Sequence, residues 1–295
     1  MQWDMHARVH LVSCGQNVQR TFAFTCRHVG GGRNEAKTAE IQLGSRQLTL
    51  HEWSKMGQIE IKNLTFAYMK GADILKDVSL SVSPGESVGL VGANGAGKST
   101  LLKILVGLNP GFAGRVTVDG IPVEKGTLPK IRQKIGYVFQ DSDSQLFMTT
   151  VGEDVAFGPR NYGLSESEVR ARTDRALAET GIAHIKDRPI MRLSGGEKKL
   201  ASIATILSME PEILLLDEPS IALDPKNRRN IIDILNRLQA AKIIASHDLD
   251  MIMDTCSRTV LMADGRIIAD GPTDKILRDK ALLEENSLEL PLRLQ

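Results

Sequence analysis

The stretch GANGAGKS at residues 92–99 restricts the possible folds of this chain more than any other feature of its sequence. Gly92, Gly97, Lys98 and Ser99 fit the pattern G-x-x-x-x-G-K-[ST]; the apolar run SVGLV ends just before it, and the amphipathic run KSTLLKILVGL begins within it. Between a strand and a helix, this pattern forms a loop whose backbone N–H groups point at phosphate groups. A chance glycine-rich turn would lack both flanking runs. The stretch therefore predicts a phosphate-binding loop that connects a strand to a helix.

The loop and the first turn of the following helix predict most of the contacts to a bound nucleotide. The helix N-terminus would add its partial positive charge, Lys98 would reach the β- and γ-phosphates, and Ser99 would hold Mg²⁺. The contacts expected from this segment are Gly92, Ala93, Asn94, Gly95, Ala96, Gly97, Lys98, Ser99 and Thr100.

The composition of the chain excludes several classes of protein. Of its 295 residues, 42 % are hydrophobic and 25 % are charged, as in ordinary soluble globular proteins. The net charge of +1 argues against a nucleic-acid or anionic-lipid partner. Cys14, Cys26 and Cys256 lack metal-ligand spacing and indicate free thiols in a reducing compartment. Since we find neither a membrane-length apolar run nor a signal peptide, we expect a cytosolic protein that reaches any membrane through a partner.

Residues 1–55 differ from the rest of the chain. They hold both Trp residues and two of the three Cys, show little periodicity, and contain the loop-like sequence VGGGRNEAK. Met56 directly precedes a well-patterned strand. We expect residues 1–55 to be an N-terminal extension that is poorly ordered or not native, with a small accessory element as the alternative. Residues 56–295 are expected to form the functional domain.

From residue 58 onward, strand patterns give way to helical ones. QIEIKNLTFAYM alternates as a strand does, and Pro84 and Gly85 separate two more strands in ILKDVSLSVSPGESVGLVG. After the phosphate loop, one helical face is expected to carry Leu101, Leu102, Leu105 and Leu108. A polar, mostly helical stretch follows at about 150–192.

The second half of the chain completes the pattern. ILLL at 213–216 is fully apolar, which is typical of a central parallel strand, and KIIAS indicates another strand. Between them, a helix is expected to bury Ile231, Ile232, Leu235 and Leu238. Alternating strands and helices predict an α/β fold, a parallel sheet with a β-rich edge and an inserted helical lobe.

Two adjacent carboxylates, Asp217 and Glu218, end the apolar strand ILLL. At the end of a buried strand, neither carboxylate is stable without a partner. Asp217 is suited to Mg²⁺ coordination beside a phosphate loop, and Glu218 to orienting and deprotonating an attacking water. The alternative is a solvated turn at the strand end, which Pro219 would favour.

Two further side chains follow strands and give weaker signals. His247 follows KIIAS, where it could contact the γ-phosphate and sense its loss. Gln140 follows the strand IGYVF, where its amide could contact Mg²⁺ or water. Taken alone, either residue could equally be structural.

LSGGE at residues 193–197 predicts a second anion site, because Ser194, Gly195 and Gly196 stand at the start of a helix with exposed backbone. One chain does not need two such sites for one γ-phosphate. Two chains arranged head to tail do need them, since each chain then completes the phosphate site of the other.

With these parts in this order, the chain resembles the ATP-binding subunit of ABC transporters over most of residues 57–295. Residues 92–99 match the Walker A motif, residues 193–197 the signature, and residues 222–224 the D-loop. The resemblance implies the ABC ATPase fold, in which a P-loop NTPase parallel sheet core carries an antiparallel β subdomain and an inserted α-helical subdomain.

The same resemblance implies roles for single residues. Tyr68 matches the aromatic residue that stacks on adenine, and Gln140 matches the Q-loop. Asp217 and Glu218 match the Walker B acid and the catalytic base, and His247 matches the switch histidine.

A finer resemblance is to the energy-coupling-factor type, which imports transition metals and vitamins. It is carried by FQDSDSQLFMTTVGEDVAFGP at 139–159, by LSGGEKKLASIA, and by LLEENSLELP in the tail. Leu200 departs from the Arg that is common in the family, and PSIALDP lacks its usual Thr after the Pro. We expect the helical lobe at about 141–195 and a C-terminal tail at about 272–295.

The resemblance implies an ATPase that uses ATP and Mg²⁺ at the cytoplasmic face of the cell membrane to import cobalt, nickel or a vitamin. Its partners would be a transmembrane scaffold, a membrane substrate-binding subunit, and an identical or related second ATPase. Ser194, Gly195 and Gly196 of one ATPase would cap the γ-phosphate that the other holds.

Two alternatives stay open at this stage. The ATPase of a conventional ABC exporter, importer or lipid transporter would use the same chemistry, and only residues 139–159 and the tail argue against it. A soluble ABC ATPase acting on nucleic acid or ribosomes usually carries paired cassettes, coiled-coil arms or zinc modules, none of which we find here. An inactive binding subunit is disfavoured because every catalytic position is filled.

Overall fold

The computed structural model describes residues 40–43, 46–49, 58–69 and 71–295. The chain divides into two compact units, Met1–Lys55 and Met56–Gln295. In the first unit, the described residues form an antiparallel hairpin of β1 (Glu40–Leu43) and β2 (Arg46–Thr49). The predictions for residues 1–55 otherwise lie outside the described residues, as do Cys14 and Cys26.

The larger sheet of the second unit has six strands in the order β12-β11-β5-β10-β9-β8. All neighbouring pairs are parallel except β11 with β12, which is antiparallel. Its strands are β5 (Ser87–Val91), β8 (Ile135–Val138), β9 (Ile213–Asp217), β10 (Ala241–Ala245), β11 (Arg258–Ala263) and β12 (Arg266–Pro272). The predicted parallel sheet is confirmed.

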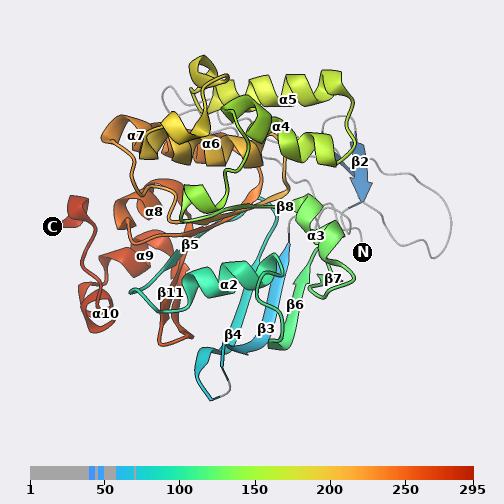
Figure 1. Cartoon of the computed structure of the whole chain (residues 1–295). Coiled ribbons are helices and arrows are strands. Elements are labelled where there is room, and N and C mark those ends of the chain that lie inside the picture. Colours follow the sequence, from blue (N-terminus) through green and yellow to red (C-terminus); the bar gives the residue numbers. More distant parts are fainter. Residues whose placement is uncertain (1–39, 44–45, 50–57, 70) are drawn as a thin grey trace, which may run out of the picture. The chain divides into compact units, whose positions relative to one another are not determined.

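A second, antiparallel sheet has the order β4-β3-β6-β7. Its strands are β3 (Ile59–Ala67), β4 (Asp73–Val82), β6 (Ala113–Val118) and β7 (Ile121–Pro122). The β-rich edge expected from the alternation of residues 58–82 is this sheet, which Figure 1 shows beside helix α2 (Lys98–Leu105).

Both faces of the six-stranded sheet are buried at its central strands, whereas the edge strand β12 is exposed or half-buried. On β9, Ile213 and Leu215 pack in one cluster with β3 and α2, whereas Leu214 and Leu216 pack in another with helices on the opposite face. Because a strand covered on both sides buries every side chain, its sequence reads as a continuous apolar run. This explains ILLL at the centre of the sheet.

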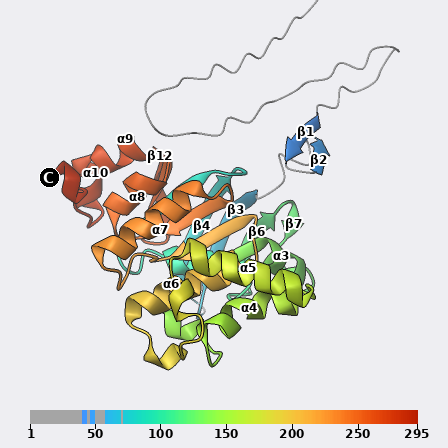
Figure 2. The same cartoon turned by 90° about the horizontal axis from the view of Figure 1, so that it is seen from above.

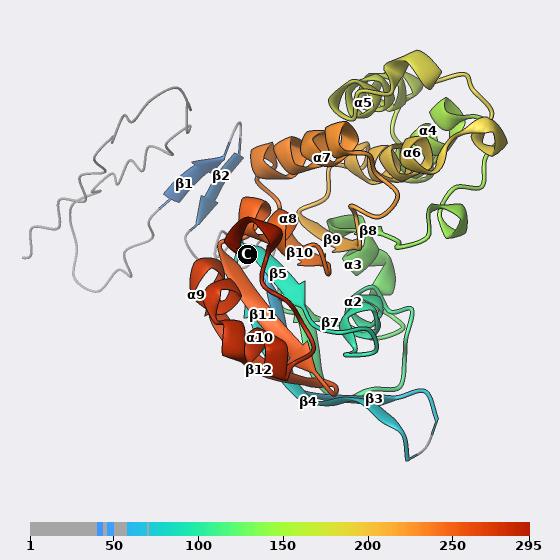
Figure 3. The ribbon, with the colours of Figure 1, turned by 90° about the vertical axis from the view of Figure 1, so that its left-hand side faces the viewer.

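The remaining helices are α3 (Leu128–Lys134), α4 (Val151–Asn161), α5 (Glu166–Glu179), α6 (Gly195–Leu207), α7 (Pro225–Arg237), α8 (Leu249–Thr255), α9 (Thr273–Arg278) and α10 (Lys280–Glu285). The single-turn 3₁₀ helices are η1 (Ser142–Ser144), η2 (Ala183–Ile185), η3 (Ile190–Arg192) and η4 (Leu292–Leu294). Figures 1 and 3 show α4, α5 and α6 on the opposite side of the unit from β3 and β4, and Figure 2 shows the same three helices gathered together. No helix in the described part of the chain is long and apolar enough to span a bilayer.

Capping boxes define where α4, α5 and α6 begin. In each, a hydroxyl side chain accepts a hydrogen bond from the backbone N–H three residues later, and a Glu there bonds back. The pairs are Thr150 with Glu153, Ser165 with Glu168, and Ser194 with Glu197. Each N-cap stabilises its helix by about 1 kcal/mol.

Each of two predicted helix faces includes one residue that lies beyond the end of its helix. Helix α2 ends at Leu105, and Leu108 lies outside it with 46 % of its surface exposed. Gly107 adopts a φ of 68°, a left-handed conformation that ends helices. Similarly, α7 ends at Arg237, so Leu238 is its C-cap residue, and Ile234 takes the buried position.

Candidate nucleotide-binding site

The predicted phosphate loop connects β5 to α2, and its geometry requires glycine at two positions. Gly92 has a φ of 151° and Gly97 a φ of 101°. A Cβ on Gly92 would lie 2.2 Å from the carbonyl oxygen of Met262, and one on Gly97 would lie 2.7 Å from Leu75 Cδ2. The motif glycines therefore let the loop pass close to neighbouring backbone and core side chains.

The loop lines a cavity of about 670 Å³ together with four of the eight other predicted site residues, whereas Asp217 and residues 194–196 are not part of its lining. Its lining is Tyr68, Ile74, residues 92–100, Gln140, Glu218, Ile221, His247, Ser287 and Leu288. Sequence analysis did not find Ser287 and Leu288, because tail residues reach this cavity only through the tertiary fold.

Lys98 is buried within the loop, with 7 % of its surface exposed. Its Nζ donates hydrogen bonds to the carbonyls of Gly92 at 2.6 Å and Ala93 at 3.1 Å. Burial lowers the pKa of Lys98, and the nearby carboxylates of Asp217 and Glu218 oppose that shift. The ammonium group is thus held near the loop with no anion in direct contact among the described residues.

Asp217 and Ser99 meet at the carboxyl end of β9. Ser99 Oγ donates to Asp217 Oδ1 at 2.9 Å, and Tyr137 Oη donates to Oδ2 at 3.1 Å. Asp217 is 2 % exposed, and burial raises its pKa. Carboxylate and hydroxyl oxygens are the ligands that Mg²⁺ prefers, so this pair fits a cation that also binds phosphate.

Glu218 is held by the residues that follow β10. Its Oε2 accepts hydrogen bonds from Ser246 Oγ at 3.1 Å and from the His247 backbone N–H at 3.3 Å, and it lies 2.8 Å from His247 Nδ1. Its backbone has a φ of 50°, a left-handed conformation that is strained for a non-glycine residue. All three contacts fall on one oxygen, which leaves Oε1 for another partner.

Tyr68 and Gln140 lie at the rim of the cavity. The Tyr68 ring is 57 % exposed and packs edge-on against Phe66. Its hydroxyl accepts a hydrogen bond from Asn109 Nδ2 at 3.0 Å and lies 3.3 Å from Thr100 Oγ1. The ring face is therefore fixed at one edge and open to a planar ligand.

The structure does not bring the predicted second anion site to this cavity. Ser194 and Gly195 are exposed at the start of α6 and do not line the cavity. A Cβ built on Gly195 would lie 3.5 Å from Ala222 Cβ, and one on Gly196 would lie 3.4 Å from the Ala222 carbonyl. Residues 194–196 thus lie beside residues 222–224, apart from the phosphate loop of their own chain.

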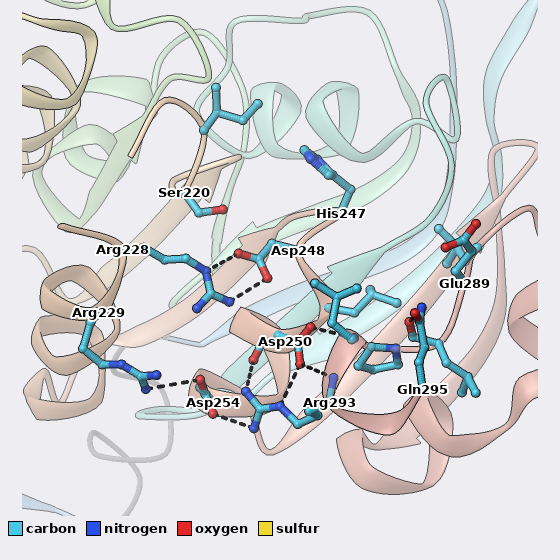
Figure 4. Close-up of a pocket in the computed structure, with 16 residues that line it drawn as sticks. Ser220, Arg228, Arg229, His247, Asp248, Asp250, Asp254, Glu289, Arg293 and Gln295 are labelled. Carbon is cyan, nitrogen blue, oxygen red and sulfur yellow. Dashed lines mark hydrogen bonds and ion pairs between the residues drawn. The ribbon is translucent and has the colours of Figure 1, made fainter. Parts of the chain in front are cut away.

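A second cavity, of about 970 Å³, adjoins the first at His247 (Figure 4). Arg228 of α7 binds Asp248 through two hydrogen bonds, Nε to Oδ2 at 2.6 Å and Nη2 to Oδ1 at 2.7 Å. Arg293 of the C-terminal tail binds Asp250 at 2.8 Å. The tail and α7 therefore both anchor the segment that begins at His247.

Sequence reasoning missed two residues that complete the carboxylate contacts. Tyr137 lies in the apolar strand β8, where an aromatic residue reads as core. Ser246 immediately precedes His247, and a serine at a strand end gives no signal of its own. Only the pairing of β8 with β9 and of β10 with β9 brings these hydroxyl groups to Asp217 and Glu218.

A phosphate loop after a parallel strand, a second strand that ends in two acids, and a helix N-terminus displayed elsewhere on the chain define an ATP-binding cassette ATPase. The family profile for ABC transporters matches residues 75–221. A putative ABC transporter ATP-binding protein of Geobacter sulfurreducens is 49 % identical over 80 % of this chain and 95 % of that protein.

Two further comparisons concern the energy-coupling-factor type. The energy-coupling factor transporter ATP-binding protein EcfA of Methanothermobacter thermautotrophicus is 45 % identical over 79 % of this chain and 76 % of that protein. The solved structure of cbiO1 from Clostridium perfringens, part of the ABC transporter complex cbiONQ, is 38 % identical with a TM-score of 0.69. The alignment covers 77 % of this chain and 93 % of the cbiO1 chain.

The chain belongs to the ABC transporter family, as one of its ATP-binding, ATP-hydrolysing subunits. The predicted ABC ATPase fold and the resemblance to the energy-coupling-factor type are confirmed.

Proposed function

We propose that this ATPase works as one of a head-to-tail pair, in which each chain supplies residues 194–196 to the phosphate loop of the other. The observation that supports this most is the separation of the two anion sites within one chain. Residues 92–99 line the cavity, while Ser194 and Gly195 are exposed on another surface beside Ala222. The second ATPase is an identical or a related chain.

In this proposal, Glu218 is the general base for ATP hydrolysis. His247 and Ser246 hold Oε2, and Oε1 accepts the proton of the attacking water. Gln140 and His247 position that water against the γ-phosphate. Lys98 and the loop N–H groups stabilise the charge that develops on the phosphate oxygens.

We assign the cation ligands to Ser99 and Asp217, with Gln140 as a further ligand at the cavity rim. Mg²⁺ bound there would neutralise charge on the β- and γ-phosphates. Within the described ranges, no group of three or more His, Cys, Asp or Glu side chains is arranged so that it could hold a metal ion. A mixed set of one carboxylate, one hydroxyl and phosphate oxygens is the arrangement that these residues allow.

Tyr68 supplies the face on which adenine stacks. Residues 92–97 and Thr100 complete the contacts around the phosphates. Ser194, Gly195 and Gly196 act from the second subunit, where the N-terminus of α6 presents free N–H groups and a positive helix end to the γ-phosphate.

The proposed docking site for a transmembrane scaffold is the surface formed by the segment between η1 and α6 in the sequence, which contains Phe147, Phe157 and Met191. Phe147 is 62 % exposed and packs edge-on against Phe157, and Met191 is 94 % exposed. The buried Asp154 side chain accepts hydrogen bonds from the backbone N–H groups of Phe147 and Met148, both at 2.9 Å, and these bonds fix the loop that carries Phe147. Apolar side chains held in place on a surface favour a protein partner, so we place the ATPase at the cytoplasmic face of the membrane.

The transported substrate is proposed from the energy-coupling-factor resemblance alone. Cobalt or nickel is the first candidate and a vitamin the second, with a membrane substrate-binding subunit making the selection. We propose residues 56–295 as the functional domain, with the helical lobe at about 141–195 and the tail at about 272–295, and residues 1–55 as an extension to it.

The catalytic assignment is tested with Glu218→Gln. This variant keeps the acceptor oxygen for His247 and Ser246 but loses the base, so it should bind ATP, form a stable dimer with ATP and Mg²⁺, and lose hydrolysis. Size-exclusion chromatography and phosphate release measure these properties. Normal hydrolysis would remove Glu218 from the role of base, and a monomer with bound ATP would refute the head-to-tail pair.

The partner assignment is tested by capturing tagged Glu218→Gln protein with ATP from detergent-solubilised membranes. Recovery of a transmembrane scaffold with a small membrane binding subunit supports the importer. Two large transmembrane domains would indicate a conventional ABC transporter instead, and ribosomal or DNA-associated partners alone would refute the transport function.

A further inference from the structure

Lys199, in the second turn of α6, is a buried cation whose hydrogen-bond partners are backbone carbonyls. Only 2 % of its surface is exposed, and Nζ donates hydrogen bonds to the carbonyls of Phe139 at 3.0 Å and Gln140 at 2.7 Å. Among the described residues, no carboxylate lies within ion-pair distance of Nζ. A buried ammonium group is costly, so these two carbonyls are the contacts that hold it.

Gln145 makes a second link between the same two segments. Its Oε1 accepts the backbone N–H of Phe139 at 3.1 Å, and its Nε2 donates to the Ser202 carbonyl at 2.6 Å and to Thr205 Oγ1 at 2.8 Å. Both backbone polar groups of Phe139 are therefore bound to α6, one through Lys199 and one through Gln145.

The two linked segments belong to different parts of the catalytic arrangement. Phe139 and Gln140 follow β8, and Gln140 lines the nucleotide cavity. Helix α6 begins with Gly195, about one helical turn before Lys199. Lys199 and Gln145 thus connect the strand end at Gln140 to the second and third turns of α6, next to the turn that begins with Gly195.

We propose that Lys199 and Gln145 are positioning residues that make the end of β8 and the N-terminus of α6 move as one body. Contact between Gln140 and the nucleotide then sets the direction in which residues 194–196 face the second subunit. This inference rests on the proposed function, because it requires that residues 194–196 act on a partner's nucleotide.

Lys242 in the same chain provides a matched control, which distinguishes a positioning role of Lys199 from a merely structural one. Lys242 is also buried, at 4 % exposure, and its Nζ also donates to two carbonyls, those of Leu238 at 2.8 Å and Ala240 at 3.1 Å. Those carbonyls follow the end of α7 and do not line the nucleotide cavity. Lys199→Met and Lys242→Met should therefore destabilise the fold to a similar degree while differing in function.

The experiment places Lys199→Met or Lys242→Met in the Glu218→Gln protein and titrates ATP with Mg²⁺. For Lys199→Met, the ATP concentration for half-maximal dimerisation should rise by about tenfold, with little change in ATP affinity measured on the monomer. Lys242→Met should shift it by less than about twofold. Equal shifts in the two variants would overturn the inference, whereas failure of Glu218→Gln itself to dimerise would refute the proposed function.

Gln145→Met gives an independent test should Lys199→Met fold poorly. Because both side chains hold Phe139, it should raise the ATP requirement in the same direction, and the double variant should be less than additive. With Glu218 intact, each variant should lower kcat at saturating ATP while ATP affinity stays unchanged. A Gln145→Met protein that dimerises like Glu218→Gln alone would overturn the inference.

Discussion

Replacing Arg228 with Met should reduce both stability and turnover, because this arginine holds the segment that carries His247. Its two hydrogen bonds to Asp248 are 2.6 and 2.7 Å long. Asp248 also accepts the Met251 N–H at 2.9 Å as the N-cap of α8, and its own N–H donates to Ser246 Oγ at 3.1 Å. Loss of the guanidinium group releases Asp248 and disturbs the neighbours that bind Glu218.

The size of the effect follows from the geometry of the pair. Hydrogen bonds to charged groups contribute about 1.5–3 kcal/mol each when buried. Here the side chains are 25 % and 21 % exposed, so solvent screens the pair, and Arg228→Met should lower the free energy of unfolding by about 1–2 kcal/mol. A displacement of the His247 segment should lower kcat by about tenfold.

Urea denaturation and steady-state ATPase assays measure these two effects, with Arg229→Met as the control. Arg229 is the next residue on α7, is 64 % exposed, and lies 3.6 Å from Asp254. It should therefore change stability by less than about 0.5 kcal/mol and leave kcat unchanged. Equal stability and turnover in the two variants would refute the reasoning.

The same pair predicts a pH dependence. Burial alone would raise the pKa of Asp248, but hydrogen bonds from Arg228 and the Met251 N–H outweigh it and hold that pKa below its usual range. The stability that the carboxylate contributes is therefore full above its unfolded pKa of about 4 and is lost as the pH falls through the lower folded value. The stability difference between wild type and Arg228→Met should shrink on acidification below about pH 4, and a constant difference would contradict this.

Three further predictions concern single residues, two in the proposed nucleotide-binding site and one on the proposed docking surface. Asp217→Asn should raise the Tm of the nucleotide-free protein in thermal denaturation and abolish Mg²⁺-dependent hydrolysis, because burial raises the pKa of Asp217 and disfavours its charged form; an unchanged or lower Tm would contradict this. Tyr68→Ala should raise the KM for ATP about tenfold with kcat unchanged, the expected loss of one base–aromatic stack. Phe147→Ser should leave hydrolysis by the isolated subunit unchanged and lower transport by the assembled complex, measured as substrate uptake into vesicles.

The parts of the site that are local in sequence could be predicted, and the parts that depend on distant strand pairing could not. The phosphate loop needs only the strand before it, the helix after it and two glycines with positive φ, so residues 87–105 carry the whole signal. Tyr137 contacts Asp217 only because β8 pairs with β9, with Tyr137 opposite Leu215. Nothing within the run IGYVF distinguishes that tyrosine from a core aromatic.

Lys199 is another residue whose environment could not be predicted from the sequence. Its position in an amphipathic helix beside other charged residues predicts a solvated side chain, yet it is among the largest fully buried side chains of the described residues. The acceptors that make burial possible are backbone carbonyls of Phe139 and Gln140, which carry no side-chain signature. The sequence shows which side chains can donate a hydrogen bond, but the positions of backbone acceptors are known only from the folded structure.

The buried charges of the proposed site explain why a bound nucleotide and its metal ion should stabilise this ATPase. Lys98 and Asp217 are both nearly buried, and burial disfavours the charged form of each, lowering the first pKa and raising the second. In the proposed site, phosphate oxygens would pair with Lys98 and a bound cation would pair with Asp217, so nucleotide and metal together would offset both desolvation penalties. In the proposed site, these pairings form beside Gln140 and Glu218, which line the same cavity as Lys98. Lys199 connects the Gln140 carbonyl to α6, whose N-terminus is the proposed contact with the second subunit.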